Sequence, residues 1–376
     1  MKFQYSYGSS LRIACITALV LVTTLSFAAW TPTGSMRTAR ASQTASLLPN
    51  GLVLVAGGTG GNNAVLASSE LYNPASGTWS STGSLHVARV SARSVLLPNG
   101  MVLTMGGCIG NDCLSNTTRS AEIYNPASGT WTVTGSMRTG RAEFVAVLLP
   151  SKKVLVAGGC TSYNVNGCVA VTTAAELYNP ATGTWTSTGA MRAGRMAMTG
   201  TVLLNGKALI AGGQTAASDA LGSSELYNPV TGTFTLAGRL ITPRSGHTAT
   251  LLTNGLVLMA GGENVSGVSI SKAELYNPAT GTYGATGSMP SNRQEHVAVL
   301  LPVGLVLVSG GNNVNSTTTT VLASCATYNP ATGRWTTAST MKSARVDHTA
   351  TLLNNGHVLA AGGDNANGEL SSAELF

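Results

Sequence analysis

Short apolar runs recur along the chain, and each is bounded by polar turn residues. One unit reads as residues 247–252, a Thr-Asn-Gly turn, residues 256–260 running into two glycines, a polar loop, residues 273–276, and an Asn-Pro-Ala-Thr-Gly turn. Short β-branched runs separated by Gly, Asn and Pro are typical of β-strands. The unit therefore predicts four antiparallel strands, named a to d in chain order.

Paired glycines end the second run of every unit. They stand 49 to 54 residues apart, at Gly57-Gly58, Gly106-Gly107, Gly158-Gly159, Gly212-Gly213, Gly261-Gly262, Gly310-Gly311 and Gly362-Gly363. A Tyr in strand c and an aromatic residue in strand d accompany most of them. A four-stranded unit cannot bury both faces alone, so seven copies predict a ring of stacked blades with the aromatic residues between them.

The two ends of the repeat are complementary. Residues 30–36 match residues 131–137, which form a strand d, whereas the seventh unit stops at Phe376 before its own strand d. Pairing of these ends would close the ring and remove two exposed strand edges. We therefore expect one circular domain over residues 29–376.

The paired Gly, the following Tyr and the later Trp resemble the kelch motif. Whole units with Leu-Pro-Asn-Gly and Asn-Pro-Ala-Thr-Gly-Thr-Trp resemble the kelch-like central domain of galactose oxidase-type proteins. The resemblance implies an all-β, seven-bladed kelch-type β-propeller.

Those oxidases hold copper with a Tyr-His pair, a Cys-crosslinked Tyr and a further His from an added C-terminal domain. Here Gly246 precedes His247, Glu295 precedes His296, and Asp347 precedes His348. The resemblance thus implies a shared scaffold without the copper-site residues, and we expect no cofactor.

The same three histidines are weak candidates for a metal site of another kind, because they occupy one strand-a position in consecutive blades. Equivalent positions in different blades should lie at least about 4.8 Å apart. Metal–nitrogen bonds are about 2 Å long, so a shared ion would need the side chains to lean together.

The N-terminus predicts export. Lys2 and Arg12 precede an apolar run, and Ser26-Phe27-Ala28 is a small-residue cleavage site, so residues 1–28 are predicted to be a signal peptide. We expect a secreted or extracellular protein, with the periplasm as the alternative, and no membrane span in the mature chain.

The formal charge of +7 without a long basic block does not favour nucleic acid as a partner. We expect the protein to be a monomer.

Export also favours disulfides between cysteines that are close in sequence. The predicted pairs are Cys108–Cys113 and Cys160–Cys168, which leaves Cys325 as a small buried residue on a strand.

The b-to-c and d-to-a connections share one face of the ring, here the loop face, and the short a-to-b and c-to-d turns share the other, the turn face. The b-to-c connections vary in length and sequence, whereas the turns are nearly identical. Variable loops on a rigid scaffold usually carry function. We therefore expect ligands at the loop face, where Tyr163 is a candidate contact.

Seven arginines recur just before strand a: Arg40, Arg89, Arg141, Arg195, Arg244, Arg293 and Arg345. One interpretation is a ring of ligand contacts near the channel mouth, since guanidinium groups suit carboxylates and phosphates. The other is structural pairing with a Glu that recurs in strand c, at Glu70, Glu122, Glu176, Glu225, Glu274 and Glu374. Ala326 replaces this Glu in the sixth unit. We favour pairing, because binding sites rarely repeat identically in every blade.

Two functional hypotheses remain. The first is a secreted binding or interaction module that presents its loop face to a glycan, a protein or a cell-surface component. The alternative is a galactose oxidase-like or other carbohydrate-active enzyme on the same scaffold, with Asp219, Glu263 and Asp364 as acidic candidates. No catalytic residue is assigned from the sequence.

Overall fold

The computed structural model describes residues 29–110, 116–165 and 167–376. The predicted signal peptide, residues 1–28, lies outside the described residues. Within them the fold is all-β, with one 3-10 turn, η1 (Gly61–Asn63), and no helix is long and apolar enough to cross a membrane.

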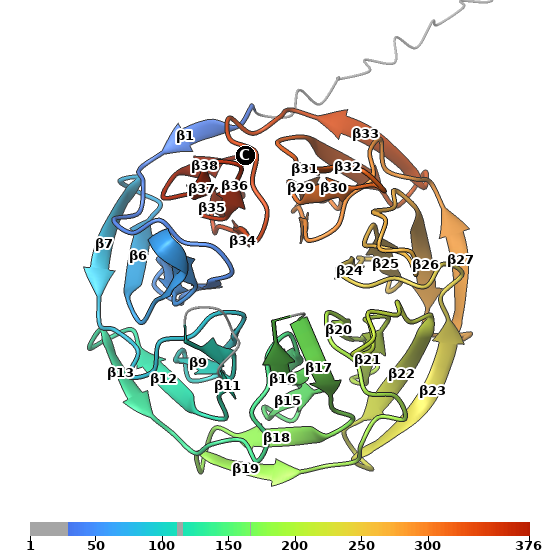
Figure 1. The fold of residues 1–376 in the computed structure, drawn as a ribbon, viewed down its shortest axis with the longest axis horizontal. Coiled ribbons are helices and arrows are strands. Elements are labelled where there is room, and N and C mark those ends of the chain that lie inside the picture. Colours follow the sequence, from blue (N-terminus) through green and yellow to red (C-terminus); the bar gives the residue numbers. More distant parts are fainter. Residues whose placement is uncertain (1–28, 111–115, 166) are drawn as a thin grey trace, which may run out of the picture.

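Seven four-stranded antiparallel sheets stand around a central axis like the blades of a propeller (Figure 1). The first three blades are β2 (Thr44–Leu47), β3 (Val53–Ala56), β6 (Ser69–Asn73) and β7 (Thr78–Thr82); β8 (Arg93–Leu96), β9 (Val102–Met105), β12 (Ala121–Asn125) and β13 (Thr130–Val133); and β14 (Val145–Leu148), β15 (Val154–Ala157), β18 (Ala175–Asn179) and β19 (Thr184–Ser187). The next three are β20 (Thr199–Val202), β21 (Ala208–Ala211), β22 (Ser223–Asn228) and β23 (Thr233–Arg239); β24 (Thr248–Leu251), β25 (Val257–Ala260), β26 (Ala273–Asn277) and β27 (Thr282–Thr286); and β28 (Val297–Leu300), β29 (Val306–Ser309), β32 (Cys325–Asn329) and β33 (Arg334–Ala338). Strand a is innermost in each blade, and the seven strands a contact one another in a closed circle.

The seventh blade joins both ends of the chain. It consists of β34 (Thr349–Leu352), β35 (Val358–Ala361), β38 (Ala373–Leu375) and β1 (Thr31–Thr33), with Thr31 opposite Leu375. Trp30 is 1% exposed and its ring lies 5.2 Å from that of Phe376, centroid to centroid. The predicted closure of the ring is confirmed.

Five small hairpins extend the b-to-c connections on the loop face. They are β4 (Thr59–Gly60) with β5 (Ala64–Val65), β10 (Cys108–Ile109) with β11 (Asn116–Thr117), β16 (Cys160–Asn164) with β17 (Gly167–Val171), β30 (Asn312–Val314) with β31 (Thr319–Val321), and β36 (Asp364–Asn365) with β37 (Gly368–Glu369). Sequence variation is thus concentrated on one rigid face.

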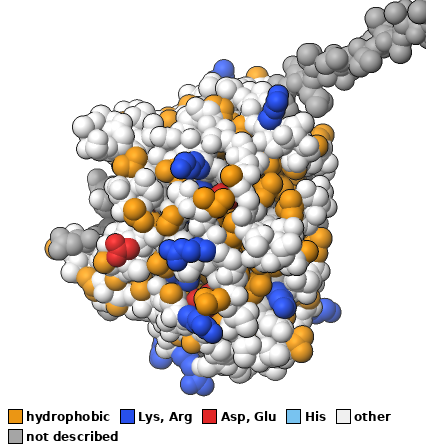
Figure 2. Space-filling view, turned by 90° about the vertical axis from the view of Figure 1, so that its right-hand side faces the viewer, with side chains coloured by type: hydrophobic (Ala, Val, Ile, Leu, Met, Phe, Trp, Pro, Cys, Tyr) orange, Lys and Arg blue, Asp and Glu red, His pale blue; other side chains and the backbone are white. Residues whose placement is uncertain are grey.

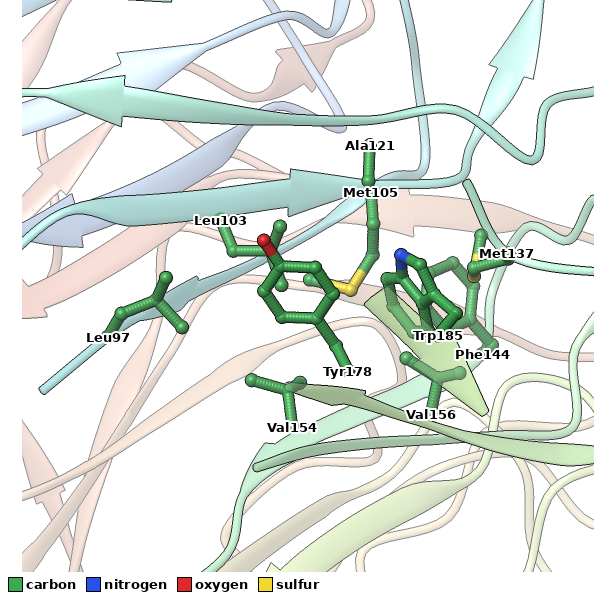
Figure 3. Close-up of a cluster of buried hydrophobic side chains, with 10 residues drawn as sticks. All are labelled: Leu97, Leu103, Met105, Ala121, Met137, Phe144, Val154, Val156, Tyr178 and Trp185. Atoms are coloured by element: carbon green, nitrogen blue, oxygen red, sulfur yellow. The ribbon is translucent and has the colours of Figure 1, made fainter. Parts of the chain in front are cut away.

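The hydrophobic core lies between neighbouring blades, as the junction of the second and third blades shows (Figure 3). Tyr178 and Trp185 lie side by side in the third blade, with ring centroids 5.0 Å apart. Both reach back to the second blade: the Tyr178 hydroxyl shares a 2.8 Å hydrogen bond with the Thr134 hydroxyl, and Trp185 Nε1 donates to the carbonyl of Gly135 at 2.7 Å. The repeated aromatic residues therefore join the blades, as predicted.

The paired glycines allow the next blade to approach closely. A Cβ atom on Gly261 would lie 2.5 Å from the carbonyl oxygen of Arg293 and 2.7 Å from Cε1 of His296, and Gly261 also has a φ of +64°. Both constraints favour glycine. The motif is a packing device and not a phosphate-binding loop.

Candidate functional site

The inner ends of the blades form a hydrogen-bonded circle around the axis, here called the collar. Its members stand two residues after each repeated arginine: Ser42, Ser91, Glu143, Ala197, Gly246, Glu295 and Asp347. Each has left-handed backbone, with φ between 51° and 59°. Six N–H groups donate to the carbonyl of the preceding collar member, over 2.9 to 3.5 Å. Left-handed backbone at non-glycine residues costs about 1–3 kcal/mol each and is concentrated at functional sites.

All seven collar residues line one cavity of about 360 Å³ on the axis, here called the central cavity. This volume falls within the range of about 300–1,000 Å³ for ligand sites. Arg93 and the three strand-a histidines also line it. Residues from all seven blades therefore line one cavity, and six of the blades contribute a polar or charged side chain to it.

Three carboxyl groups of the collar give the cavity its chemistry. The Glu295 and Asp347 side chains are exposed to solvent, while Glu143 is half-buried. Asn312 Nδ2 donates to Glu295 Oε2 at 3.1 Å, and the Tyr163 hydroxyl donates to Glu143 Oε1 at 3.0 Å. Each fixed carboxyl thus keeps one oxygen for other partners.

Crowding of these groups favours their protonated forms. Burial, followed by repulsion from Asp347, Glu143 and Glu263, raises the pKa of Glu295 to about 8. Burial also raises the pKa of Glu143 and of Asp347. Water reaches Glu295 and Asp347, yet protein surrounds them on all sides of the cavity, which explains why exposed carboxyls have raised pKa values.

Arg93 is the cation of the cavity. Its Nε donates to the carbonyl of Phe144 at 2.9 Å, and its guanidinium interacts electrostatically with Glu143 and Asp347. The cavity therefore combines hydrogen-bond acceptors with a fixed donor.

The seven repeated arginines lie inside the blades and do not line the cavity; each is at most 1% exposed. In six blades Nη2 contacts the repeated Glu, as in Arg40–Glu70 at 3.0 Å and Arg244–Glu274 at 2.6 Å. Each Nη1 donates to the carbonyl of the first paired glycine. The predicted Arg–Glu pairing is confirmed in these six blades, and the geometry favours a structural role for the ring.

In the sixth blade, which lacks the Glu, the repeated arginine has other hydrogen-bond partners. Arg293 faces Ala326, and its Nη2 donates instead to Ser291 Oγ at 2.8 Å and Ser324 Oγ at 2.9 Å. In the other blades the Glu also accepts backbone N–H groups, but the equivalent position here is Pro290, which has none. The sixth blade thus lacks the carboxylate acceptor, because Ala326 replaces the Glu, and it also lacks one backbone N–H donor, because residue 290 is proline.

His247, His296 and His348 line the cavity wall but are 5–6% exposed. Their Nε2 atoms contact hydroxyls of the preceding blade: Thr199 at 3.1 Å, Thr248 at 3.0 Å and Ser309 at 3.4 Å. Burial lowers the pKa of His247 and His348 to about 3. In other blades Gln43, Ala92, Phe144 and Met198 fill the same position. No group of three His, Cys, Asp or Glu side chains among the described residues could hold a metal ion.

The cysteines fix one part of the loop face. Cys160 and Cys168 form the predicted disulfide across the β16–β17 hairpin, which carries Tyr163. Cys113 lies outside the described residues, so the predicted Cys108–Cys113 disulfide stays a prediction. Cys325 is buried, as predicted, and burial raises the pKa of its thiol to about 11.

Sequence reasoning missed Glu143 and Arg93 and noted Glu295 and Asp347 only as neighbours of histidines. Of the acidic candidates, Glu263 accepts from Ser245 Oγ at 2.8 Å close to Glu295, and Asp364 begins the β36–β37 hairpin. Asp219 lies in an exposed turn outside the cavity lining. The spacing of two residues from each repeated arginine was the signal that could have found the collar.

Comparison with known proteins agrees with this architecture. A Kelch motif family matches residues 89–138. The fold is similar to that of a fungal alcohol oxidase of the AA5 family solved in complex with copper, with a TM-score of 0.73 and 20% identity over 92% of this chain and 75% of that chain. No curated protein matches in sequence. At 20% identity the likeness extends to the fold alone, so the expected lack of a copper site stays a prediction. The chain is a seven-bladed β-propeller that carries a kelch motif and shares its fold with an AA5 oxidase.

Proposed function

We propose that the protein is an exported binding module whose central cavity receives a hydroxyl-rich group, such as the end of a glycan chain. The observation that carries this proposal is the convergence of Glu143, Glu295, Asp347 and Arg93 in one cavity of about 360 Å³. Sugar hydroxyls both donate and accept hydrogen bonds, so they match carboxyls beside a guanidinium.

The rigidity of the cavity also supports binding. The collar hydrogen bonds hold the backbone of these residues, Asn312 orients the Glu295 carboxyl, and Tyr163 orients the Glu143 carboxyl. A site that is ordered before the ligand arrives loses little entropy on binding. A loop of a protein partner is the other occupant that this geometry suits.

Carbohydrate binding can be tested by saturation-transfer NMR and calorimetry with neutral and amino sugars. The double variant Glu295→Gln/Asp347→Asn should lose at least about tenfold in affinity, since it alters two hydrogen-bonding side chains and each hydrogen bond contributes about 0.5–1.5 kcal/mol. The matched control is Asp219→Asn, which neutralises an exposed carboxyl outside the cavity lining. Equal affinity of the double variant and the control would show that the central cavity is not the binding site.

A carbohydrate-active enzyme is the second candidate, and the raised pKa of Glu295 favours it. A carboxyl with a pKa of about 8 is protonated at neutral pH and can act as a general acid. Release of reducing ends from oligosaccharides, abolished by Glu295→Gln, would support glycoside cleavage. Stoichiometric copper with peroxide release from sugars or alcohols would instead indicate an oxidase, and neither activity would leave the binding module.

A further inference from the structure

Positive and negative charges occupy different parts of the molecule. Apart from the six paired Glu residues inside the blades, the carboxyl groups of the described chain belong to the collar or the b-to-c connections: Glu143, Asp219, Glu263, Glu295, Asp347, Asp364 and Glu369. The exposed cations lie elsewhere. In the side view, Lys and Arg side chains are spread over the outer wall and few carboxylates appear (Figure 2).

Seven of these cations form what we call the basic rim, at the outer edge of the loop face. Its members are Arg37, Arg119, Arg138, Arg192, Arg239, Lys272 and Lys342. All are exposed, and each stands near the end of an outermost strand d or the start of a strand c. Strands d and c are the two strands of each blade that lie farthest from the axis (Figure 1).

The buried Arg–Glu pairs hold the backbone of the rim in place. The second carboxylate oxygen of the paired Glu accepts the N–H of a rim residue: Glu70 from Arg37 at 2.7 Å, Glu176 from Arg138 at 2.7 Å, Glu225 from Arg192 at 2.9 Å and Glu374 from Lys342 at 2.6 Å. The Lys272 carbonyl accepts from Arg244 Nη1 at 2.8 Å. Four rim cations therefore lie at equivalent positions, which His86, Ile241 and Pro290 occupy at the other three blades.

Within the described part of the chain, no rim cation forms a salt bridge; the salt bridges there use the buried arginines and His86. A polyanion lying along the rim would meet several of these cations at once and release its own counterions.

We propose that the basic rim binds a chain of acidic polysaccharide, independently of the central cavity. Guanidinium and ammonium groups suit uronate and sulfate groups. Single-stranded nucleic acid is a poorer match, because its binding sites use aromatic stacking platforms. The large exposed hydrophobic side chains of the described residues include no aromatic residue. The predicted export of the protein also favours a polysaccharide partner.

The test compares two variants that lose equal charge. The rim variant is Arg37→Gln/Arg138→Gln/Arg192→Gln/Lys342→Gln, which keeps the backbone N–H groups bound to the Glu ring. The control variant is Lys152→Gln/Lys153→Gln/Lys207→Gln/Arg334→Gln, whose cations belong to the turn face. Binding to fluorescent polygalacturonate is measured over a range of salt concentrations, with neutral dextran, anionic vesicles and single-stranded DNA as further probes.

The wild type and the control variant should bind polygalacturonate, with an affinity that falls steeply with salt. The rim variant should bind at least about tenfold more weakly, and its salt slope should be shallower by about one unit for each contacting cation removed. Equal weakening of both variants, absence of binding, or a preference for vesicles or DNA would overturn the proposal. The cavity variant Glu295→Gln/Asp347→Asn should bind polygalacturonate like wild type, so failure of either proposal is recognised separately.

Discussion

The Arg–Glu pair of the fifth blade allows a quantitative test of what holds the blades together. Glu274 accepts Arg244 Nη2 at 2.6 Å, the N–H of Ile241 at 2.7 Å and the N–H of Thr242 at 2.9 Å. Glu274→Ala would leave a buried guanidinium and two N–H groups without an acceptor. Removing one partner of a buried ion pair costs about 3–5 kcal/mol.

The sixth blade provides the rescue, because it lacks the Glu naturally. Copying its residues Pro290, Ser291 and Ala326 into the fifth blade gives the triple variant Ile241→Pro/Thr242→Ser/Glu274→Ala. The proline removes the N–H of residue 241, which would otherwise have no acceptor, and the serine places at residue 242 the hydroxyl group that accepts from Arg293 in the sixth blade. We expect the triple variant to recover about half or more of the lost stability.

Urea titration followed by tryptophan fluorescence measures both free energies of unfolding. Glu274→Gln serves as the control, because it keeps the side-chain volume and one acceptor oxygen and should lose less than Glu274→Ala. A loss below about 1 kcal/mol in Glu274→Ala, or a triple variant no more stable than the single one, would refute the reasoning.

Three further predictions concern pH and cysteine chemistry. His348 has a folded-state pKa of about 3, so it contributes stability that is present above its unfolded pKa of about 6.5 and is lost as pH falls towards 3. Gln43 fills the same position in the first blade. The variant His348→Gln should therefore reduce the loss of stability in urea titrations between pH 6.5 and 4, by up to about 1.4 kcal/mol per pH unit. Glu295 has the opposite sign: its raised pKa makes stability fall as pH rises from about 4.5 to 8, and Glu295→Gln should reduce that fall in thermal melts, an unchanged profile contradicting the shift. Cys325 should resist an aromatic disulfide reagent in the native state and react fully after unfolding, because burial raises the pKa of its thiol to about 11; rapid native labelling would show that the site opens.

The repeat made most of the fold predictable, whereas the site left little signal in the sequence. Glycine pairs, aromatic residues and the Arg–Glu positions recur because every blade meets its neighbour in the same way. The collar residues share a backbone conformation but not a side-chain type: Ser42, Glu143, Ala197 and Gly246 occupy equivalent positions. A pattern search therefore overlooks them until the ring brings them together.

The seven repeated arginines show that a regular sequence pattern can suggest a binding site where the structure favours a structural role. Their regularity suggested a ligand funnel as one interpretation, yet the guanidiniums are buried and bonded within their own blades. Residues that are identical in every blade are those that maintain the structure of each blade. Charge that differs between blades, as at Glu295 and Arg93, is the more informative feature for function.

The pairing of β1 with β38 has a consequence for biosynthesis. The two strands are separated by nearly the whole chain, and the Thr31 hydroxyl that contacts the Leu375 carbonyl lies 344 residues away in sequence. During synthesis β1 has no partner strand, and the indole of Trp30 stays uncovered, until the last strand emerges from the ribosome. Contacts of such long sequence separation form slowly. Nascent chains that stall in the final blade should therefore expose β1 and Trp30, in addition to the growing end, to chaperones and proteases.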